Sequence, residues 1–371
     1  MAGTGARTAA ARLAGALAGL LASLAAAMAQ PDAGSQGDAA IARGRYIFHA
    51  GACDSCHTDH PQDGAFLAGG RELRTHLGTF YVPNITPDPE TGIGGWSFED
   101  FRRAMQEGVA PDGSHYYPVF PYPWYTGITE QDLRDLWAYL TTVTPVRDAT
   151  PPHDLPFPLS VRAFVWFWKL FNFTEDGSAL DPGLPAAWNR GAYLVNHLGH
   201  CGACHTPKDY FFNFQRWRFL GGAGRIPGPY PAPNITPHLP TGIGAWSEAD
   251  IVRALRAAIA PDGTPIRGAM AEYVHSGSSF LSEEDLQAVA LYLRSVTPVE
   301  TELAPGESGR DERLHMAERP ADQKEGGAAG VSPGTGSVGS ALLRLSRGGR
   351  STGENRPPPL LFPHARAPAH P

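Results

Sequence analysis

The chain has 371 residues, of which 42% are hydrophobic and 18% are charged, and its formal net charge is −7. This length is sufficient for two ordinary domains with residues to spare. The negative net charge and the lack of a basic stripe in the sequence argue against a nucleic-acid partner.

The N-terminal residues have the pattern of an export signal. Two arginines precede an apolar run over 13–27, which ends in the Ala-Met-Ala sequence of an expected cleavage site. A membrane anchor is the alternative interpretation, but this run is shorter than the roughly 20 apolar residues that a spanning helix needs. We therefore expect a signal peptide over 1–29 and a periplasmic mature chain.

Two short motifs contain all four cysteines of the chain, Cys53-Asp-Ser-Cys56-His57 and Cys201-Gly-Ala-Cys204-His205. In such a CxxCH motif the two thiols can bond to the vinyl groups of a haem, and the adjacent histidine can reach its iron. A structural zinc site does not require a histidine directly after each second cysteine. A redox dithiol of the thioredoxin type needs a βαβ context, which is not visible here. We therefore expect two covalently attached haem c groups, with His57 and His205 as iron ligands.

A long repeat surrounds these two motifs. The segment PNITPDPETGIGGWS from Pro83 returns as PNITPHLPTGIGAWS from Pro233, an offset of 150 residues. The sequence TTVTPV near the end of the first copy likewise matches RSVTPV near the end of the second. We therefore predict two copies of one domain, over 38–149 and 186–299, which we call the first repeat and the second repeat.

Each repeat is expected to consist of helices and loops. Capping boxes, in which a Ser or Thr is followed three residues later by an Asp, mark expected helix starts at Ser97, Thr129, Ser247 and Ser282. Gly44 and Gly191 fall inside the first expected helix of each repeat, where glycine costs about 1 kcal/mol relative to alanine. That cost suggests the close approach of another helix. No alternating strand pattern of useful length is present, so we predict an all-α fold.

The predicted linker, residues 150–185, contains the aromatic stretch PFPLSVRAFVWFWKLFNF over 156–173. A helix that is apolar on all sides must be buried or contact lipid. We expect this helix to pack across the two repeats. The alternative is an interfacial membrane helix over 161–173, with Arg162 and Lys169 reaching toward lipid headgroups.

The composition changes after about residue 300. Residues 301–371 are rich in Gly, Pro, Ser and charged residues and contain few core-forming side chains. Such a segment cannot bury enough apolar area to offset the entropy lost on ordering. We therefore expect a disordered C-terminal tail.

The second ligand of each iron is expected to differ between the repeats. Met270 is the only methionine of the second repeat, and it lies 65 residues after His205. A thioether ligand raises the reduction potential of a haem, which suits an electron carrier. The offset of 150 aligns Met270 with Phe120, which has no lone pair. For the first haem we expect either ligation by His115 or a five-coordinate iron, and we set Met105 aside because it belongs to the preceding helix. Tyrosinate is disfavoured because a phenol with a pKa of about 10 must lose its proton.

These motifs resemble those of dihaem class I cytochromes c, in particular the cytochrome subunits of periplasmic alcohol and aldehyde dehydrogenases. The resemblance covers residues 38–300 and rests on both CxxCH motifs, both PNITP segments, the YPxxPYP loop and WNRGAYLVNHLGHCGACHTP. It implies two tandem class I cytochrome c domains joined by the aromatic linker helix. The alcohol dehydrogenase subunits usually carry a third haem domain and a C-terminal anchor, which this sequence does not show, so the partner enzyme stays open.

The resemblance implies an electron carrier rather than an enzyme in its own right. We expect it to accept electrons from a periplasmic dehydrogenase subunit and to pass them to a terminal oxidase or another cytochrome. The alternative is a haem enzyme, such as a peroxidase, that uses an open site on the first haem. Such an enzyme needs distal acid–base groups, and the loop offers only His115 and tyrosines. A haem-based sensor would need an output domain, which the sequence does not show.

Overall fold

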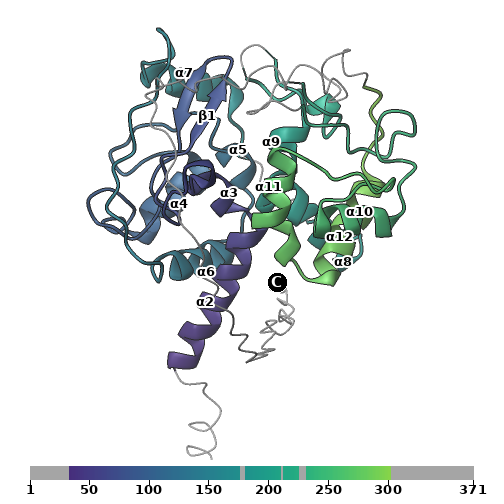
Figure 1. The fold of residues 1–371 in the computed structure, drawn as a ribbon, viewed down its shortest axis with the longest axis horizontal. Coiled ribbons are helices and arrows are strands. Elements are labelled where there is room, and N and C mark those ends of the chain that lie inside the picture. The colour runs from purple at the N-terminus through teal and green to yellow at the C-terminus, as the bar shows by residue number, and fades with distance from the viewer. Residues whose placement is uncertain (1–32, 176–179, 210–211, 225–230, 302–371) are drawn as a thin grey trace, which may run out of the picture. The chain divides into compact units, whose positions relative to one another are not determined.

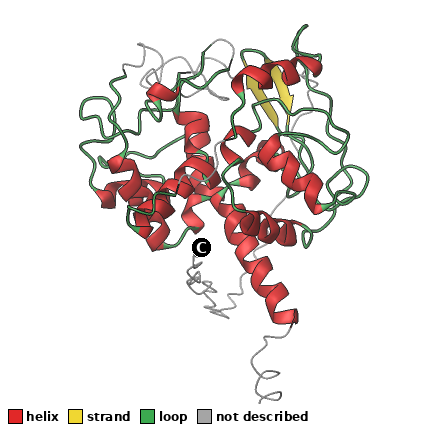
Figure 2. Ribbon diagram, turned by 180° about the vertical axis from the view of Figure 1, so that it is seen from behind, coloured by secondary structure: helices red, strands yellow, loops and turns green. Residues whose placement is uncertain are grey.

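The computed structural model describes residues 33–175, 180–209, 212–224 and 231–301. The predicted signal peptide lies outside these residues, as does the predicted tail apart from Thr301. The described part is predominantly helical, as expected from the sequence, with one short hairpin (Figures 1 and 2).

The first repeat has two helices and a short 3-10 turn, then a hairpin, then three further helices. Its elements are α2 (Ala33–Ala50), α3 (Cys53–His57), η1 (His60–Gln62), β1 (Glu72–Thr75), β2 (Gly78–Tyr81), α4 (Phe98–Glu107), α5 (Tyr122–Tyr125) and α6 (Glu130–Leu140).

The linker and the second repeat supply the remaining elements. They are α7 (Ala163–Asn172) in the linker, then α8 (Ala186–Tyr193), the π-helical turn η2 (Leu194–Leu198) that continues it, α9 (Cys201–His205), η3 (Arg216–Arg218), α10 (Glu248–Ala257), α11 (Ala269–Ser276), η4 (Ser278–Phe280) and α12 (Glu283–Ser295).

The hairpin is a departure from the all-helical prediction. β1 and β2 pair antiparallel with Glu72 opposite Tyr81 and Thr75 opposite Gly78. The backbone of Thr79 also exchanges hydrogen bonds with that of Asp154, at 2.9 Å in each direction, so the linker adds to the hairpin edge. Strands of four residues are too short for an alternating pattern to be recognised in the sequence.

The predicted capping boxes form completely at α4 and α10 and only in part at α6 and α12. Ser97 and Ser247 each exchange hydrogen bonds with the aspartate three residues later. At α6 the backbone N–H of Thr129 instead donates to the hydroxyl of Tyr193, at 3.1 Å. At α12 the backbone N–H of Ser282 donates to the hydroxyl of Tyr46, at 3.0 Å. A tyrosine of the other repeat therefore completes each of these two helix starts.

Two glycines allow the first helix of each repeat to cross the last helix closely. A Cβ atom added to Gly44 would lie 1.8 Å from the backbone oxygen of Asp135 in α6. A Cβ atom added to Gly191 would lie 2.0 Å from the backbone oxygen of Ala288 in α12. The close approach predicted from the sequence is confirmed at both positions. Salt bridges flank these crossings, Arg43–Asp135 and Arg190–Asp285, both at 2.7 Å.

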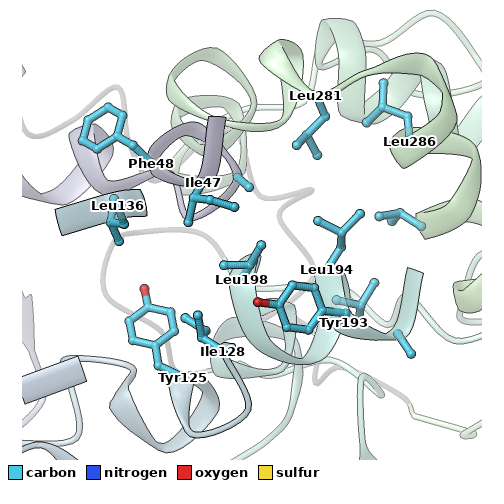
Figure 3. Packing of buried hydrophobic residues seen from close by; sticks show 14 of the residues in the cluster. Ile47, Phe48, Tyr125, Ile128, Leu136, Tyr193, Leu194, Leu198, Leu281 and Leu286 are labelled. Carbon is cyan, nitrogen blue, oxygen red and sulfur yellow. The ribbon is translucent and has the colours of Figure 1, made fainter. Parts of the chain in front are cut away.

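One continuous hydrophobic core includes side chains of both repeats. Ile47 and Phe48 of α2 lie in the same cluster as Leu194 and Leu198 of the second repeat, and all four are at most 2% exposed. Figure 3 shows these side chains converging with those of α5 and α6. The apolar side chains at the boundary between the repeats are therefore as deeply buried as those within each repeat.

Helix α7 does not pack across the two repeats, and that prediction was wrong. Trp166, Phe167 and Phe171 are 52%, 56% and 71% exposed, whereas Val165 is 5% exposed. The side chain of Lys169 points toward the first repeat, where its Nζ donates a hydrogen bond to the backbone oxygen of Glu107. The helix thus covers one repeat and leaves an apolar face exposed. Within the described residues, no helix combines the length and the apolar character needed to cross a membrane.

We predict that Gly44→Ala destabilises the protein by about 1–3 kcal/mol or more, because the added methyl group has no space against α6. The control is Gly37→Ala in the same helix, where no atom lies within 4 Å of the added Cβ. That change should be neutral or stabilise the protein by up to about 1 kcal/mol. Chemical denaturation of both variants measures the difference, and equal stabilities would contradict the proposed helix crossing.

Candidate haem-binding sites

A cavity of about 540 Å³ lies in the first repeat beside its CxxCH motif. Its walls are mainly apolar and come from α3, β2, α4, the loop before α5, α6 and the linker. The lining includes Cys53, Cys56, His57, Val82, Ile85, Ile93, Trp96, Phe101, Met105, Phe120, Tyr125, Leu136 and Leu155. A large apolar cavity with two thiols and an imidazole on its wall suits a flat hydrophobic group that is attached covalently.

Each CxxCH motif forms a single helical turn that follows a residue in the left-handed conformation. Ala52, at φ 48°, precedes α3, and His200, at φ 39°, precedes α9. The turn brings the two thiols and the histidine of each motif together on one short element. None of the four cysteines is disulfide-bonded. Among the described residues, no group of three or more His, Cys, Asp or Glu side chains is arranged to hold a metal ion.

Both motif histidines have the tautomer that iron ligation needs. His57 donates through Nδ1 to the backbone oxygen of Pro83 at 2.8 Å, and His205 donates through Nδ1 to that of Pro233 at 2.7 Å. A carbonyl oxygen can only accept, so Nδ1 carries the proton and Nε2 keeps its lone pair. Burial lowers the pKa of both imidazoles, which favours the neutral form. The residues present therefore fit a haem iron in both repeats.

The repeated PNIT segments hold these proline carbonyls in place. Asn84, which is buried, donates through Nδ2 to the backbone oxygen of Val146 at 2.7 Å and accepts the backbone N–H of Thr86 at 2.8 Å. Asn234 makes the same contacts in the second repeat, with Val299 at 2.6 Å and Thr236 at 2.8 Å. Each network ties the segment beside the histidine to the TPV sequence at the end of its repeat.

Met270 is the second residue of α11 and is half-buried. The same helix carries Tyr273, which lines a smaller cavity together with Cys201 and Leu255. Helix α11 therefore lies beside the second CxxCH motif, as an opposing ligand would require. Ligation of the second iron by Met270 stays a prediction.

His115 is not part of the cavity lining in the first repeat. Its Nδ1 lies 3.1 Å from Nζ of Lys169, and its pKa is lowered by burial and then by the charge of that lysine. Because an ammonium group only donates, the neutral ring carries its proton on Nε2, which is not the ligating tautomer. This position gives no support to His115 as an iron ligand.

The tyrosines near this cavity are also poor ligands. Burial raises the pKa of Tyr116 to about 12 and that of Tyr125 well above its ordinary value. Each phenol therefore keeps its proton at neutral pH.

The cavity wall includes Met105, which the sequence analysis set aside, and two histidines that it did not consider, His153 and His200. Met105 shares a face of α4 with Phe101, four residues earlier, and that helical spacing could have predicted its direction. His153, in the linker, accepts the backbone N–H of Tyr81 through Nδ1 at 3.2 Å. His200 belongs to the second repeat and still lines the first cavity, which no local sequence signal could have predicted.

Comparison with known proteins gives consistent matches. The family model described as "Cytochrome c" matches residues 41–144. A "Diheme cytochrome c-type" protein of Cereibacter sphaeroides is 41% identical over 273 residues, which cover 72% of this chain and 89% of that protein. The "Fructose dehydrogenase cytochrome subunit" of Gluconobacter japonicus is 38% identical over 269 residues, covering 72% of this chain and 54% of the subunit. The "Alcohol dehydrogenase (quinone), cytochrome c subunit" of Gluconobacter oxydans is 36% identical over 273 residues, with coverages of 71% and 56%. The chain thus spans little more than half the length of those two subunits.

Proposed function

Because the chain belongs to the cytochrome c family, we propose that it is a dihaem electron carrier in the periplasm. Membership of the family implies a covalently bound haem c. The finer proposal is one haem in each of two tandem class I cytochrome c domains, over 38–149 and 186–299, with the linker over 150–185 between them. A signal peptide over 1–29 and a disordered tail over 301–371 complete the proposed organisation.

The observation that carries this proposal is the equivalence of the two CxxCH turns. In both, the histidine donates Nδ1–H to a proline carbonyl and keeps Nε2 available for iron. The paired thiols would form the thioether bonds, and the apolar wall of the first cavity would exclude water. A haem held in this way supplies one-electron redox chemistry.

We propose that the electron donor is a dehydrogenase subunit and that the acceptor is another cytochrome or a terminal oxidase. Support comes from the relatives that are named as cytochrome subunits of fructose, gluconate and quinone alcohol dehydrogenases. The peroxidase alternative lacks comparable support, because His115, its acid–base candidate, lies outside the cavity wall.

Purified protein should contain two haems per chain by pyridine haemochrome and should retain them in acidic acetone, because both are held by thioether bonds. The double variant Cys53→Ser/Cys56→Ser should retain one covalent haem and keep the absorbance of the other. The mature protein should also show two reversible one-electron steps in a redox titration. One haem per chain in the wild type, or haem lost to the solvent, would contradict the dihaem assignment.

We also propose that the two haems differ in their second ligand, with Met270 bound to the second. Met270→Ala should abolish a methionine-to-iron charge-transfer band and lower one reduction potential, because a thioether favours the reduced iron. Met105→Ala is the comparison for the second haem: Met105 lies on the wall of the first cavity, so its removal should leave the potential of the second haem unchanged.

Electron paramagnetic resonance tests the first haem in the same samples. A high-spin signal in the wild type indicates a five-coordinate iron. A low-spin signal that becomes high-spin only in His115→Ala supports His115 instead, and a change in Met105→Ala identifies that sulfur. A charge-transfer band that keeps its full intensity in Met270→Ala would contradict the proposed ligand.

The exposed face of α7 is the surface that we propose for peripheral membrane contact, within residues 161–173. Phe164, Trp166, Phe167, Leu170 and Phe171 are all between 48% and 71% exposed, and this face carries no charged side chain. Trp and Phe side chains on one face of a helix are typical of interfacial anchors. Lys169 does not reach outward as the sequence suggested, whereas Arg162 at the start of the helix is exposed, so apolar burial must supply most of the affinity.

The mature protein should therefore cosediment with vesicles of phosphatidylcholine and phosphatidylglycerol, and Trp166→Glu/Phe167→Glu should abolish cosedimentation. The control is Trp217→Glu, which alters an aromatic residue that is 77% exposed elsewhere. Each buried apolar side chain contributes about 1.5–3 kcal/mol, so the loss should be large. If wild-type protein stays in the supernatant, α7 is not a membrane anchor.

A further inference from the structure

His200 is next to the second CxxCH motif in the sequence and lines the cavity of the first repeat. It directly precedes Cys201, whose sulfur is one of the two attachment points in the second repeat. Its imidazole nevertheless lines the cavity of the first repeat, together with Cys53 and Cys56. A continuous path of covalent bonds therefore leads from the second attachment cysteine to the wall of the first cavity. An electron that follows this path crosses a gap between non-bonded atoms only between the His200 ring and a haem bound in the first cavity.

The His200 ring is fixed by contacts on both sides of the boundary between the repeats. Its Nδ1 lies 3.2 Å from the backbone oxygen of Leu198 and 3.4 Å from the hydroxyl oxygen of Tyr125. The rings of His200 and Tyr125 meet edge to face with centroids 5.4 Å apart. Because the carbonyl accepts, Nδ1 carries the proton of the neutral ring. Burial lowers the pKa of His200 to about 4, so the ring stays neutral at physiological pH.

Tyr125 connects this ring to the aromatic groups of the first site. It is 7% exposed, and its ring centroid lies 5.8 Å from that of Phe120, which occupies the position aligned with Met270. Tyr125 and His200 both line the first cavity. The two rings therefore form a packed patch of wall that joins one repeat to the other without intervening solvent.

The neighbouring residue Trp124 shows how closely α5 approaches the second motif. A Cβ atom added to Gly202, between the two cysteines of that motif, would lie 2.2 Å from the Trp124 ring. The backbone oxygen of Trp124 also accepts a hydrogen bond from His197, at 2.9 Å. Helix α5 of the first repeat is thus packed directly against the attachment turn of the second. This packing fixes Tyr125 at its distance from His200.

The first repeat has no equivalent of His200. The residue that directly precedes Cys53 is Ala52, which adopts the same left-handed conformation but carries only a methyl group. The residue before the second motif therefore reaches the first cavity, whereas the residue before the first motif has no side chain long enough to do the same toward the second.

We propose that His200, positioned by Tyr125, forms the electron path between the two haem sites of this chain. Tunnelling decays less steeply along covalent bonds and through closely packed atoms than across a gap. The step is a single-electron exchange in which one iron goes from ferrous to ferric and the other from ferric to ferrous, with no bond made or broken and no proton required. The proposal rests on the proposed dihaem function.

The test is the rate of electron equilibration between the two haems after rapid photoreduction of the fully oxidised, full-length protein. The two haems are distinguished by the methionine-to-iron band proposed for the second. His200→Ala, which reproduces the residue of the first repeat, should slow equilibration several-fold. His200→Phe keeps a ring in the wall and should give an intermediate rate. Tyr125→Phe should slow it less than His200→Ala, because only the hydroxyl contact is removed. His275→Ala, which removes an exposed imidazole from the second repeat, should leave the rate unchanged.

Haem content, the two reduction potentials and thermal stability are measured for each variant, so that a loss of driving force or of folding is recognised. A slower rate at unchanged potentials and unchanged haem content supports the proposal, since a merely structural role would alter these properties. An unchanged rate in both His200 variants, with two haems present, overturns the bridge and leaves the dihaem function intact. A single haem per chain overturns both.

Discussion

The hydrogen bond from each motif histidine to a proline carbonyl is the constraint on which the rest of the structure depends. It fixes the proton on Nδ1 and orients the ring, so that Nε2 is the group available to iron. The carbonyl can serve only if its segment is rigid, and the buried Asn84 and Asn234 networks supply that rigidity. Leaving a buried amide unpaired would cost about 1–3 kcal/mol, so the hydrogen bonds of the two asparagines stabilise the segments that carry the proline carbonyls.

The two repeats are held together by reciprocal contacts. Tyr46 donates to Asp285 at 2.6 Å, and Tyr193 donates to Asp132 at 2.5 Å. Each tyrosine hydroxyl also accepts a backbone N–H at the start of the other repeat's last helix. A helix start leaves its first amides without partners, so each of these helices is complete only when the other repeat is present. The continuous hydrophobic core reinforces this mutual dependence.

Within this reciprocal arrangement the two sites are unequal. Phe120 of the first repeat occupies the position that aligns with Met270 of the second. The first cavity is also lined by His153 from the linker and by His200 from the second repeat. In the proposed dihaem arrangement, two sites with the same attachment chemistry and different walls would give the haems different potentials, because burial and nearby groups tune each iron separately.

Local chemistry in the sequence was sufficient for the attachment turns, the repeat and the helix starts. The CxxCH spacing, the Ser97–Asp100 cap and the tight crossing at Gly44 depend on neighbouring residues or on backbone sterics, so they could be recognised before any packing was known. The direction of Met105 and the short β1–β2 hairpin were missed, and the outward apolar face of α7 agrees only with the alternative interpretation of that segment. The pairing of Tyr46 with α12, the turn of Lys169 toward the first repeat and the entry of His200 into the first cavity were decided only by the tertiary structure. The first two contacts join residues that are 239 and 62 positions apart, and the cavity wall is built from several elements. No local sequence pattern encodes which of these surfaces pack together in the folded chain.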